Sequence, residues 1–543
     1  MRPALLLWFL NQRKAVGHQH WLYQQIKLVS LALLAALPFC LAFFPDSNFA
    51  PYVSLIAFVP SLLVVSRLGT AREVVVFCVM TSLCAQALVT DWLPHTFANI
   101  FDVNLLGASV LSGLAWAFWC GGVSLFLILY RYFHEAHLLF VACMGVVLFQ
   151  YWPSVFGGNP FTALMHAPAL SGSALFIGTA GIELVAILFS AWLARALIKR
   201  RVGPAIQALS ALMLLLALDG FAAWLVDDAP KTTLKVTLVQ TTNVYSKKLS
   251  SGAEIEMFAE QLVKESRFAP DLIVFPENVF SFNLADDPQA GAAAMDALKR
   301  VSSEHPVAFL ISTVQSVPGN GSAIKNHKRP SLVSAMLISD GAVQGHADKA
   351  RTIPFAEYTP AWATAPLMWL GAKIETRTPS SRYSAMSVKG VPLVPLNCFE
   401  SLDQAVVESR LGGGPGLLIN QSNLDDFGTP ASSNYRAALW GHMAHEQRWV
   451  NQWHAPMVRA VRGGGSTSID ASGAVDQALL EQSWGKEWVS TPIAVPGASP
   501  IYAYTGHMRL AFSLFILALA VFASARCVAL RLRSKRRPLV GEI

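Results

Sequence analysis

Long apolar runs constrain the fold of this chain more than any other feature of its sequence. A bilayer core about 30 Å thick needs roughly 20 apolar residues in a helix, because each residue rises about 1.5 Å. Charged residues make up only 14% of the chain, against roughly a quarter in soluble proteins. We therefore expect about eight spanning helices, near 28–44, 51–66, 74–92, 105–130, 137–152, 174–194, 205–226 and 508–525.

The basic residues predict the orientation of these helices. Outside 231–507, Lys and Arg fall, with one exception, at the N-terminus, on alternate loops such as 67–72 and 195–201, and in the tail from Arg526 onward. Such loops are cytoplasmic by the positive-inside rule. Seven crossings would then deliver residues 231–507 to the outer side. We expect a membrane domain at 1–230, an outer domain at 231–507, and a closing helix with a basic tail at 508–543.

The net charge of +7 does not indicate a nucleic-acid partner. Residues 231–507 are close to neutral, and the excess lies in the cytoplasmic loops and in RLRSKRRP at 531–538. A polybasic stretch after a spanning helix is typical of contact with anionic lipid.

The outer domain has the pattern of an α/β fold. Continuous apolar runs, expected of strands buried on both faces, alternate with amphipathic helical stretches such as 255–268. The runs are 236–240, 271–275, 307–312, 331–339, 391–396 and 416–420. About 270 residues suffice for a full layered core.

Cys398 is the only cysteine between Cys143 and Cys527, so it has no disulfide partner within 231–507. In an oxidising compartment a lone thiol is either a buried core residue or a reactive group. Two stretches favour the second reading. Glu277 ends a buried strand, where open α/β sheets build their sites, and HADKARTIPFAEYTP supplies Lys349 and Glu357. A thiol nucleophile needs a base and a positive donor for the oxyanion, which Glu277 and Lys349 can provide, although either could be an ordinary surface charge.

The segments VFPE, DKARTIPFAEYTP and NCFE, in this order, resemble the Glu, Lys and Cys motifs of the nitrilase (carbon–nitrogen hydrolase) superfamily. Together with the expected topology, the chain resembles bacterial apolipoprotein N-acyltransferases over nearly its whole length. The resemblance implies a multi-pass inner-membrane protein with a periplasmic nitrilase-type α-β-β-α sandwich. It also implies that Glu277 is the general base, Lys349 the oxyanion-stabilising cation and Cys398 the nucleophile.

The same resemblance makes Glu357 and Glu400 accessory residues that position Lys349 and line the site. Other positions depart from the family. Phe399 replaces the usual Tyr, Asp426 stands where Trp-Phe-Gly usually begins, and Gln452 and Ala455 replace the Glu and Arg of Glu-x-x-Arg-Pro. These departures bear on the substrate more than on the reaction.

The implied function is acyl transfer from a phospholipid, through a thioester on Cys398, to the N-terminal amine of a diacylglyceryl-cysteine lipoprotein. No cofactor and no metal is expected, and the protein is expected to be a monomer. Two alternatives remain open: a nitrilase-like membrane protein of a conjugal transfer system with another acceptor, and a non-catalytic membrane scaffold. The segment WATAPLMWLGAK (362–373) either dips into the membrane interface or belongs to the core.

Overall fold

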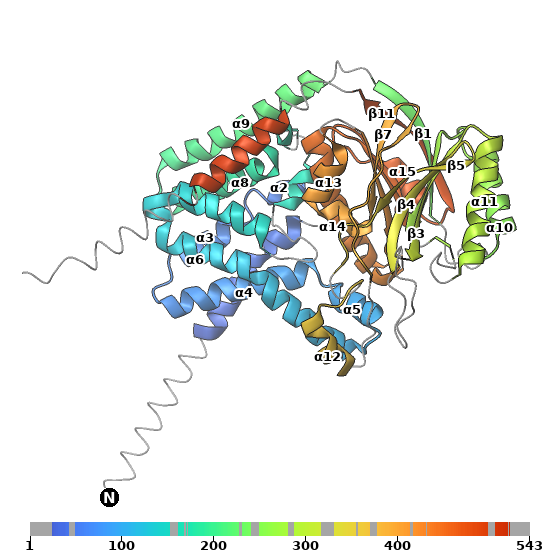
Figure 1. Cartoon of the computed structure of the whole chain (residues 1–543). Coiled ribbons are helices and arrows are strands. Elements are labelled where there is room, and N and C mark those ends of the chain that lie inside the picture. The colour runs from blue at the N-terminus through green and yellow to red at the C-terminus, as the bar shows by residue number, and fades with distance from the viewer. Residues whose placement is uncertain are drawn as a thin grey trace, which may run out of the picture.

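The structure is a computed structural model of the whole chain (Figure 1). It describes residues 24–42, 49–152, 161–167, 170, 172–226, 231–240, 249–277, 279–280, 287–316, 331–353, 357–369, 377–412, 416–429, 432–497, 505–519 and 521.

The N-terminal half is helical, and five of its helices are long and apolar enough to cross a membrane. These are Gln24–Ala42, Ala71–Val89 (α4), Leu105–Glu135 within α6 (Leu105–Tyr151), Ala174–Lys199 (α8) and Val202–Trp224 within α9 (Val202–Val226). Shorter elements lie between them: α2 (Ala50–Val53), α3 (Val59–Val65), α5 (Leu93–Phe101) and η1 (Thr162–His166).

The expected number of eight spans is not confirmed. The run 51–66 folds as the two short helices α2 and α3, each with a proline in its first turn. Proline has no N–H to donate, so it begins a helix more readily than it continues one. The runs 137–152 and 508–525 correspond to the shorter apolar helices His137–Tyr151 and Thr505–Leu519, and most of the residues beyond 519 lie outside the described part of the chain.

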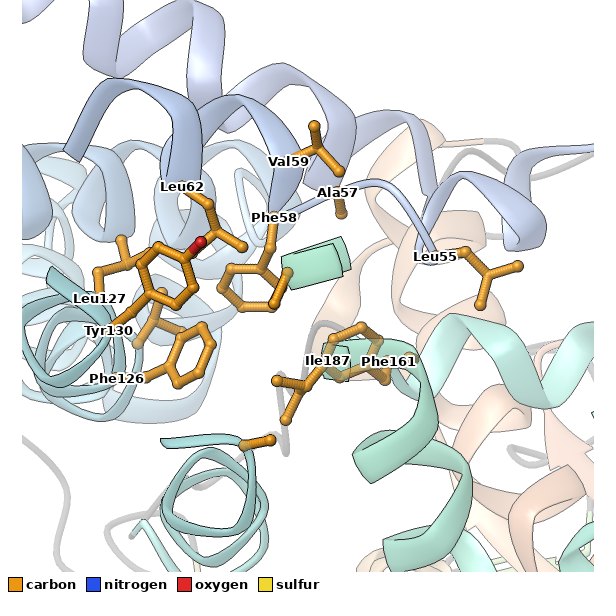
Figure 2. Packing of buried hydrophobic residues seen from close by; sticks show 14 of the residues in the cluster. Leu55, Ala57, Phe58, Val59, Leu62, Phe126, Leu127, Tyr130, Phe161 and Ile187 are labelled. Atoms are coloured by element: carbon orange, nitrogen blue, oxygen red, sulfur yellow. The ribbon is translucent and has the colours of Figure 1, made fainter. Parts of the chain in front are cut away.

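Aromatic side chains fill the core between these helices (Figure 2). The ring of Phe58 lies 4.9 to 5.6 Å, between centroids, from those of Phe39, Phe126, Phe149 and Phe161. Such pairs contribute about 0.5–1.5 kcal/mol each beyond the area they bury. The cluster thus connects the N-terminal helix, the α2–α3 turn and α6.

Two sheets form the second half of the molecule. The six-stranded sheet has the order β11-β1-β2-β3-β4-β5, and the five-stranded sheet has the order β10-β9-β8-β7-β6. Strands β1 to β3 are parallel, as are β7 to β9, and the flanking strands are antiparallel. The strands are β1 (Lys231–Val239), β2 (Leu272–Glu277), β3 (Ala308–Ser316), β4 (Ser331–Ser339), β5 (Ala342–Asp348), β6 (Met386–Val388), β7 (Val391–Asn397), β8 (Leu417–Asn423), β9 (Met457–Arg462), β10 (Thr467–Ile469) and β11 (Trp488–Pro496).

The domain is an α-β-β-α sandwich, as expected. Apolar residues of both sheets share one core, α10 (Gly252–Glu265) and α11 (Pro288–Glu304) pack on the six-stranded sheet, and α13 (Gln404–Leu411) and α14 (Ser433–Trp453) pack on the five-stranded sheet. All six predicted strands are present. The remaining elements of the domain are α12 (Ala361–Trp369), η2 (Cys398–Leu402), η3 (Asp425–Phe427) and α15 (Gln477–Ser483).

Helix α14 joins the sandwich to the helical half. Its Asn451 donates to the backbone carbonyl of Met165, and the ring of His166 stacks on Trp440 with centroids 4.0 Å apart. One face of α14 therefore packs on the sheet and another on the membrane helices.

Candidate active site

Three strand ends bring the predicted residues together at one edge of the sandwich. Glu277 ends β2, Lys349 follows β5 directly, and Cys398 follows β7. Pro276 cannot donate to the ladder, and the register of β2 against β3 shifts between Val274 and Glu277, as expected where a strand contains proline.

Lys349 lies between two carboxylates. Its Nζ is 3.2 Å from Oε1 of Glu277 and 2.7 Å from Oε1 of Glu357, and all three side chains are buried. The guanidinium of Arg377 donates to the same Glu357 oxygen at 3.1 Å and lies 3.9 Å from Glu277. Two of the three N–H donors of Lys349 are thus used, and among the described residues the third has no acceptor.

The surroundings push the pKa values of the two carboxyl groups apart. Burial raises the pKa of Glu277, and Lys349 only partly opposes this effect. Burial also acts on Glu357, but Lys349 and Arg377 outweigh it and lower the pKa of that carboxyl. For Lys349, burial favours the neutral amine, yet the carboxylates prevail and its pKa is raised. The site therefore favours a charged Lys349 and a charged Glu357 beside a Glu277 carboxyl group whose raised pKa suits it to exchanging protons.

Cys398 has the backbone of a strained turn. Its φ is +52°, in the left-handed region that non-glycine residues rarely adopt, at a cost of about 1–3 kcal/mol. The hydroxyl of Ser401, three residues later, donates to the Cys398 carbonyl at 3.0 Å. Burial raises the pKa of the Cys398 thiol to about 12, with Glu277 adding to the effect and Lys349 and the Asn423 backbone amide opposing it. The thiol is neutral at rest, so attack requires a base.

A buried ion pair connects the lysine turn to the cysteine turn. Glu400 accepts the backbone N–H of Ala350 at 2.6 Å and that of Asn397 at 2.9 Å. Its two oxygens also accept from Arg410 at 2.8 and 2.9 Å. Arg410 in turn donates to the carbonyls of Asp348 and Pro395. Glu400 therefore contacts the backbone beside Lys349 and Cys398 rather than the Lys349 side chain.

The structure thus brings together all five residues named from the sequence. It also adds Arg377, Arg410 and the Asn423 amide, which no motif marked. Arg377 follows its partner Glu357 by 20 residues and Arg410 follows Glu400 by 10, and neither spacing belongs to a motif, so the sequence does not single them out. Of the departures from the family, Gln452 and Ala455 are buried, Phe399 is half-buried beside Cys398, and the Asp426 side chain lies outside the described part.

The raised pKa of Glu277 predicts the pH dependence of Cys398 reactivity. As the pH falls through a value above the usual 4.5, Glu277 gains a proton and can no longer accept the one from the thiol. We expect the rate at which iodoacetamide alkylates Cys398 to fall over the same pH range. In Glu277→Gln the rate at neutral pH should drop by about 10²-fold or more, and recover only as the pH approaches the thiol's own pKa. Cys398→Ser gives the background of the other cysteines, and an unchanged profile in Glu277→Gln would exclude Glu277 as the base.

Comparison with known proteins gives relatives that match this chain over about 60% of its length. No family model matches the chain. The apolipoprotein N-acyltransferase of Brucella suis is 27% identical over 381 residues, which cover 62% of this chain and 67% of that protein. The chain resembles apolipoprotein N-acyltransferases. Those of Sinorhizobium medicae and Agrobacterium fabrum are 28% and 25% identical, over 61% and 69% of their own lengths.

This similarity to apolipoprotein N-acyltransferases confirms the resemblance seen in the motifs, and it supports an acyltransferase of membrane character. Among solved structures, a carbon–nitrogen hydrolase from Helicobacter pylori matches 51% of this chain and 92% of its own, with 16% identity and a TM-score of 0.36. Nit3 of Saccharomyces cerevisiae, of the nitrilase superfamily, matches 51% of this chain and 94% of its own, with 12% identity and a TM-score of 0.34.

Helix α12, which begins four residues after Glu357, exposes large apolar side chains. Trp362, Met368 and Trp369 are 77%, 64% and 85% exposed, while Ala363 packs against Phe101 of α5. Such a patch is typical of a surface that meets lipid or a partner. Leu370, the next residue of the segment 362–373, lies outside the described residues.

We expect this patch to lie in the membrane interface. A spin label on Trp369→Cys in reconstituted protein should collide more often with oxygen, which concentrates in lipid, than with a water-soluble nickel chelate. The same label on Met257→Cys, at an exposed apolar position of α10, should show the reverse. If the label at position 369 collided with the nickel chelate as often as the label at position 257 does, α12 would be exposed to water and the interfacial position would be excluded.

Proposed function

We propose that the protein is a membrane acyltransferase that carries an acyl chain from a phospholipid, as a thioester on Cys398, to the N-terminal amine of a lipoprotein. The observation that supports this most is the buried Lys349 between Glu277 and Glu357, next to a cysteine in a strained turn. The similarity to apolipoprotein N-acyltransferases supports the choice of acceptor, because those proteins are named for N-acylation of apolipoproteins.

In the first half-reaction the Cys398 sulfur attacks the ester carbonyl of the phospholipid while Glu277 takes the thiol proton. The developing oxyanion lies near the ammonium of Lys349 and the amide of Asn423, which stabilise it by charge and hydrogen bonding. The carbon–oxygen bond to glycerol then breaks, Glu277 returns the proton to the leaving alkoxide, and a lysophospholipid departs. An acyl thioester on Cys398 remains.

In the second half-reaction the amine of the acceptor attacks the thioester carbonyl. Glu277 accepts the amine proton, the carbon–sulfur bond breaks, and the thiolate takes the proton back. The product is an amide and the enzyme is regenerated. The thioester keeps the acyl group activated, so the transfer needs neither a nucleotide nor a cofactor. Catalysis on the periplasmic face of the inner membrane is part of this proposal.

The direct test is to incubate purified protein with phospholipid and determine the mass of the Cys398 peptide. We expect an acyl adduct that hydroxylamine removes, and no adduct on this peptide in Cys398→Ala. The acceptor can then be identified by adding a diacylglyceryl-cysteine peptide or other amines. An accessible Cys398 thiol that stays unmodified would overturn the acyltransferase and favour a scaffold.

A further inference from the structure

A cavity of about 510 Å³ lies where the sandwich meets the membrane helices. Its walls come from the ends of α6 and α14, from α8 near Gly178, from α13, and from the helix Thr505–Leu519. That last helix, in red, runs beside α8 and α9 and approaches α13 (Figure 1). None of the five predicted site residues lines the cavity, so it is separate from the candidate active site.

Arg509 is the main cation of this cavity. It is only 5% exposed, its guanidinium lies 4.2 Å from the centroid of the Trp453 ring, and its Nη1 donates to the Leu175 carbonyl at 2.9 Å. The helical path of α8 is broken at Gly178, where φ is +63°. Arg509 is also the single exception to the charge pattern of the membrane segments. A buried arginine in such a segment pairs with an anion or with backbone carbonyls, and Nη2 of Arg509 has no such partner among the described residues.

Three buried donors of the cavity walls have no acceptor among the described residues: Nη2 of Arg509, Nε2 of Gln150 and Nε1 of Trp453. The Gln150 amide oxygen accepts from Arg448, which leaves its nitrogen without a partner. Buried polar groups in proteins are nearly always hydrogen-bonded. A group with several acceptor oxygens and negative charge, such as a phosphate, is suited to donors of this kind.

The cavity also contains an anion. Glu408 of α13 accepts from the amides of Gln404 and Gln452, and it forms no salt bridge with Arg509 or with any other described residue. The wall therefore presents a cation and an anion that are not paired with each other. This arrangement is complementary to a headgroup with a phosphate at one end and an ammonium at the other.

The remaining wall is apolar and opens along the outside of the last helix. Leu510, Leu514 and Leu517 line the cavity and are 59%, 55% and 43% exposed. We propose that the cavity binds a zwitterionic phospholipid, with its phosphate at Arg509, its ammonium at Glu408 and its acyl chains along these leucines. This site is additional to Cys398 and does not depend on the proposed acyl transfer.

Native mass spectrometry of the full-length protein in detergent tests the proposal by counting bound lipids during titration. The probes are phosphatidylethanolamine, phosphatidylglycerol and free glycerophosphoethanolamine. Ser513→Trp fills the cavity from a position that lines it, and Ala518→Trp is the matched control at an exposed position of the same helix outside it. We expect Ser513→Trp to weaken phosphatidylethanolamine binding at least about tenfold, because the indole occupies the headgroup space, and Ala518→Trp to leave it unchanged.

Two further results decide the chemistry of the ligand. Wild type should prefer phosphatidylethanolamine over phosphatidylglycerol, and Glu408→Gln should remove this preference without abolishing binding of either lipid. Equal binding by the two tryptophan variants would overturn the site, and a wild type without preference would overturn the zwitterionic headgroup. Equally tight binding of free glycerophosphoethanolamine would assign the cavity to a soluble phosphodiester instead. An unchanged rate of Cys398 alkylation verifies that each variant is folded.

Discussion

Lys349→Met is expected to lower the rate of acyl transfer by roughly 10²–10³-fold, the usual effect of removing one preorganised donor to an oxyanion. Methionine keeps most of the length of the side chain and removes its charge. On the proposed mechanism the oxyanion then retains only the Asn423 amide. The measurement is the single-turnover rate of acyl-enzyme formation on Cys398.

The same change should also destabilise the fold, because it leaves the buried carboxyl groups of Glu277 and Glu357 with only the more exposed Arg377 as a cation. Removing one partner of a buried ion pair costs about 3–5 kcal/mol. Lys349→Met combined with Glu357→Gln removes one carboxylate as well, so it should recover much of the stability and none of the activity. Lys389→Met, at an exposed lysine paired with Asp271, is the control. A folded Lys349→Met protein with normal acylation would exclude the assigned role.

Arg410→Met is expected to have the second large effect, although Arg410 is a positioning residue and no reacting atom contacts it. The change leaves the fully buried Glu400 unpaired and frees the carbonyls of Asp348 and Pro395. We expect the free energy of unfolding to fall by about 3–5 kcal/mol. Because a small displacement of the reacting groups can cost about 10²-fold in rate, acylation of Cys398 should also slow.

A double-mutant cycle with Glu400→Gln separates the pair from its surroundings. The two changes share one set of hydrogen bonds, so their effects on the free energy of unfolding should differ from additive by about 0.5–3 kcal/mol. Arg300→Met, which removes an exposed pair with Glu256, should change little. Additive effects of Arg410→Met and Glu400→Gln would mean that the pair does not connect the two turns.

Several elements of the fold could be predicted because their signal is local. Strands β2, β4, β7 and β8 are buried on both faces and appear in the sequence as continuous apolar runs. Strands β5 and β11 escaped prediction because they lie at the edges of their sheet, where half of their side chains face water. The run 51–66 is apolar enough for a membrane-spanning helix, but in the structure it is divided between the short helices α2 and α3.

The sequence by itself determined the division into apolar helices and an α/β domain, since composition and periodicity are properties of neighbouring residues. It also determined the identity of Glu277, Lys349, Glu357, Cys398 and Glu400 as site candidates, since each lies in a short motif. Only the tertiary structure decided that Arg377 and Arg410 complete the ion pairs, that Cys398 occupies a left-handed turn, and that Arg509 and Glu408 share a cavity. The ion pairs and the turn depend on backbone paths that no motif specifies, and the cavity depends on contacts between segments far apart in the chain.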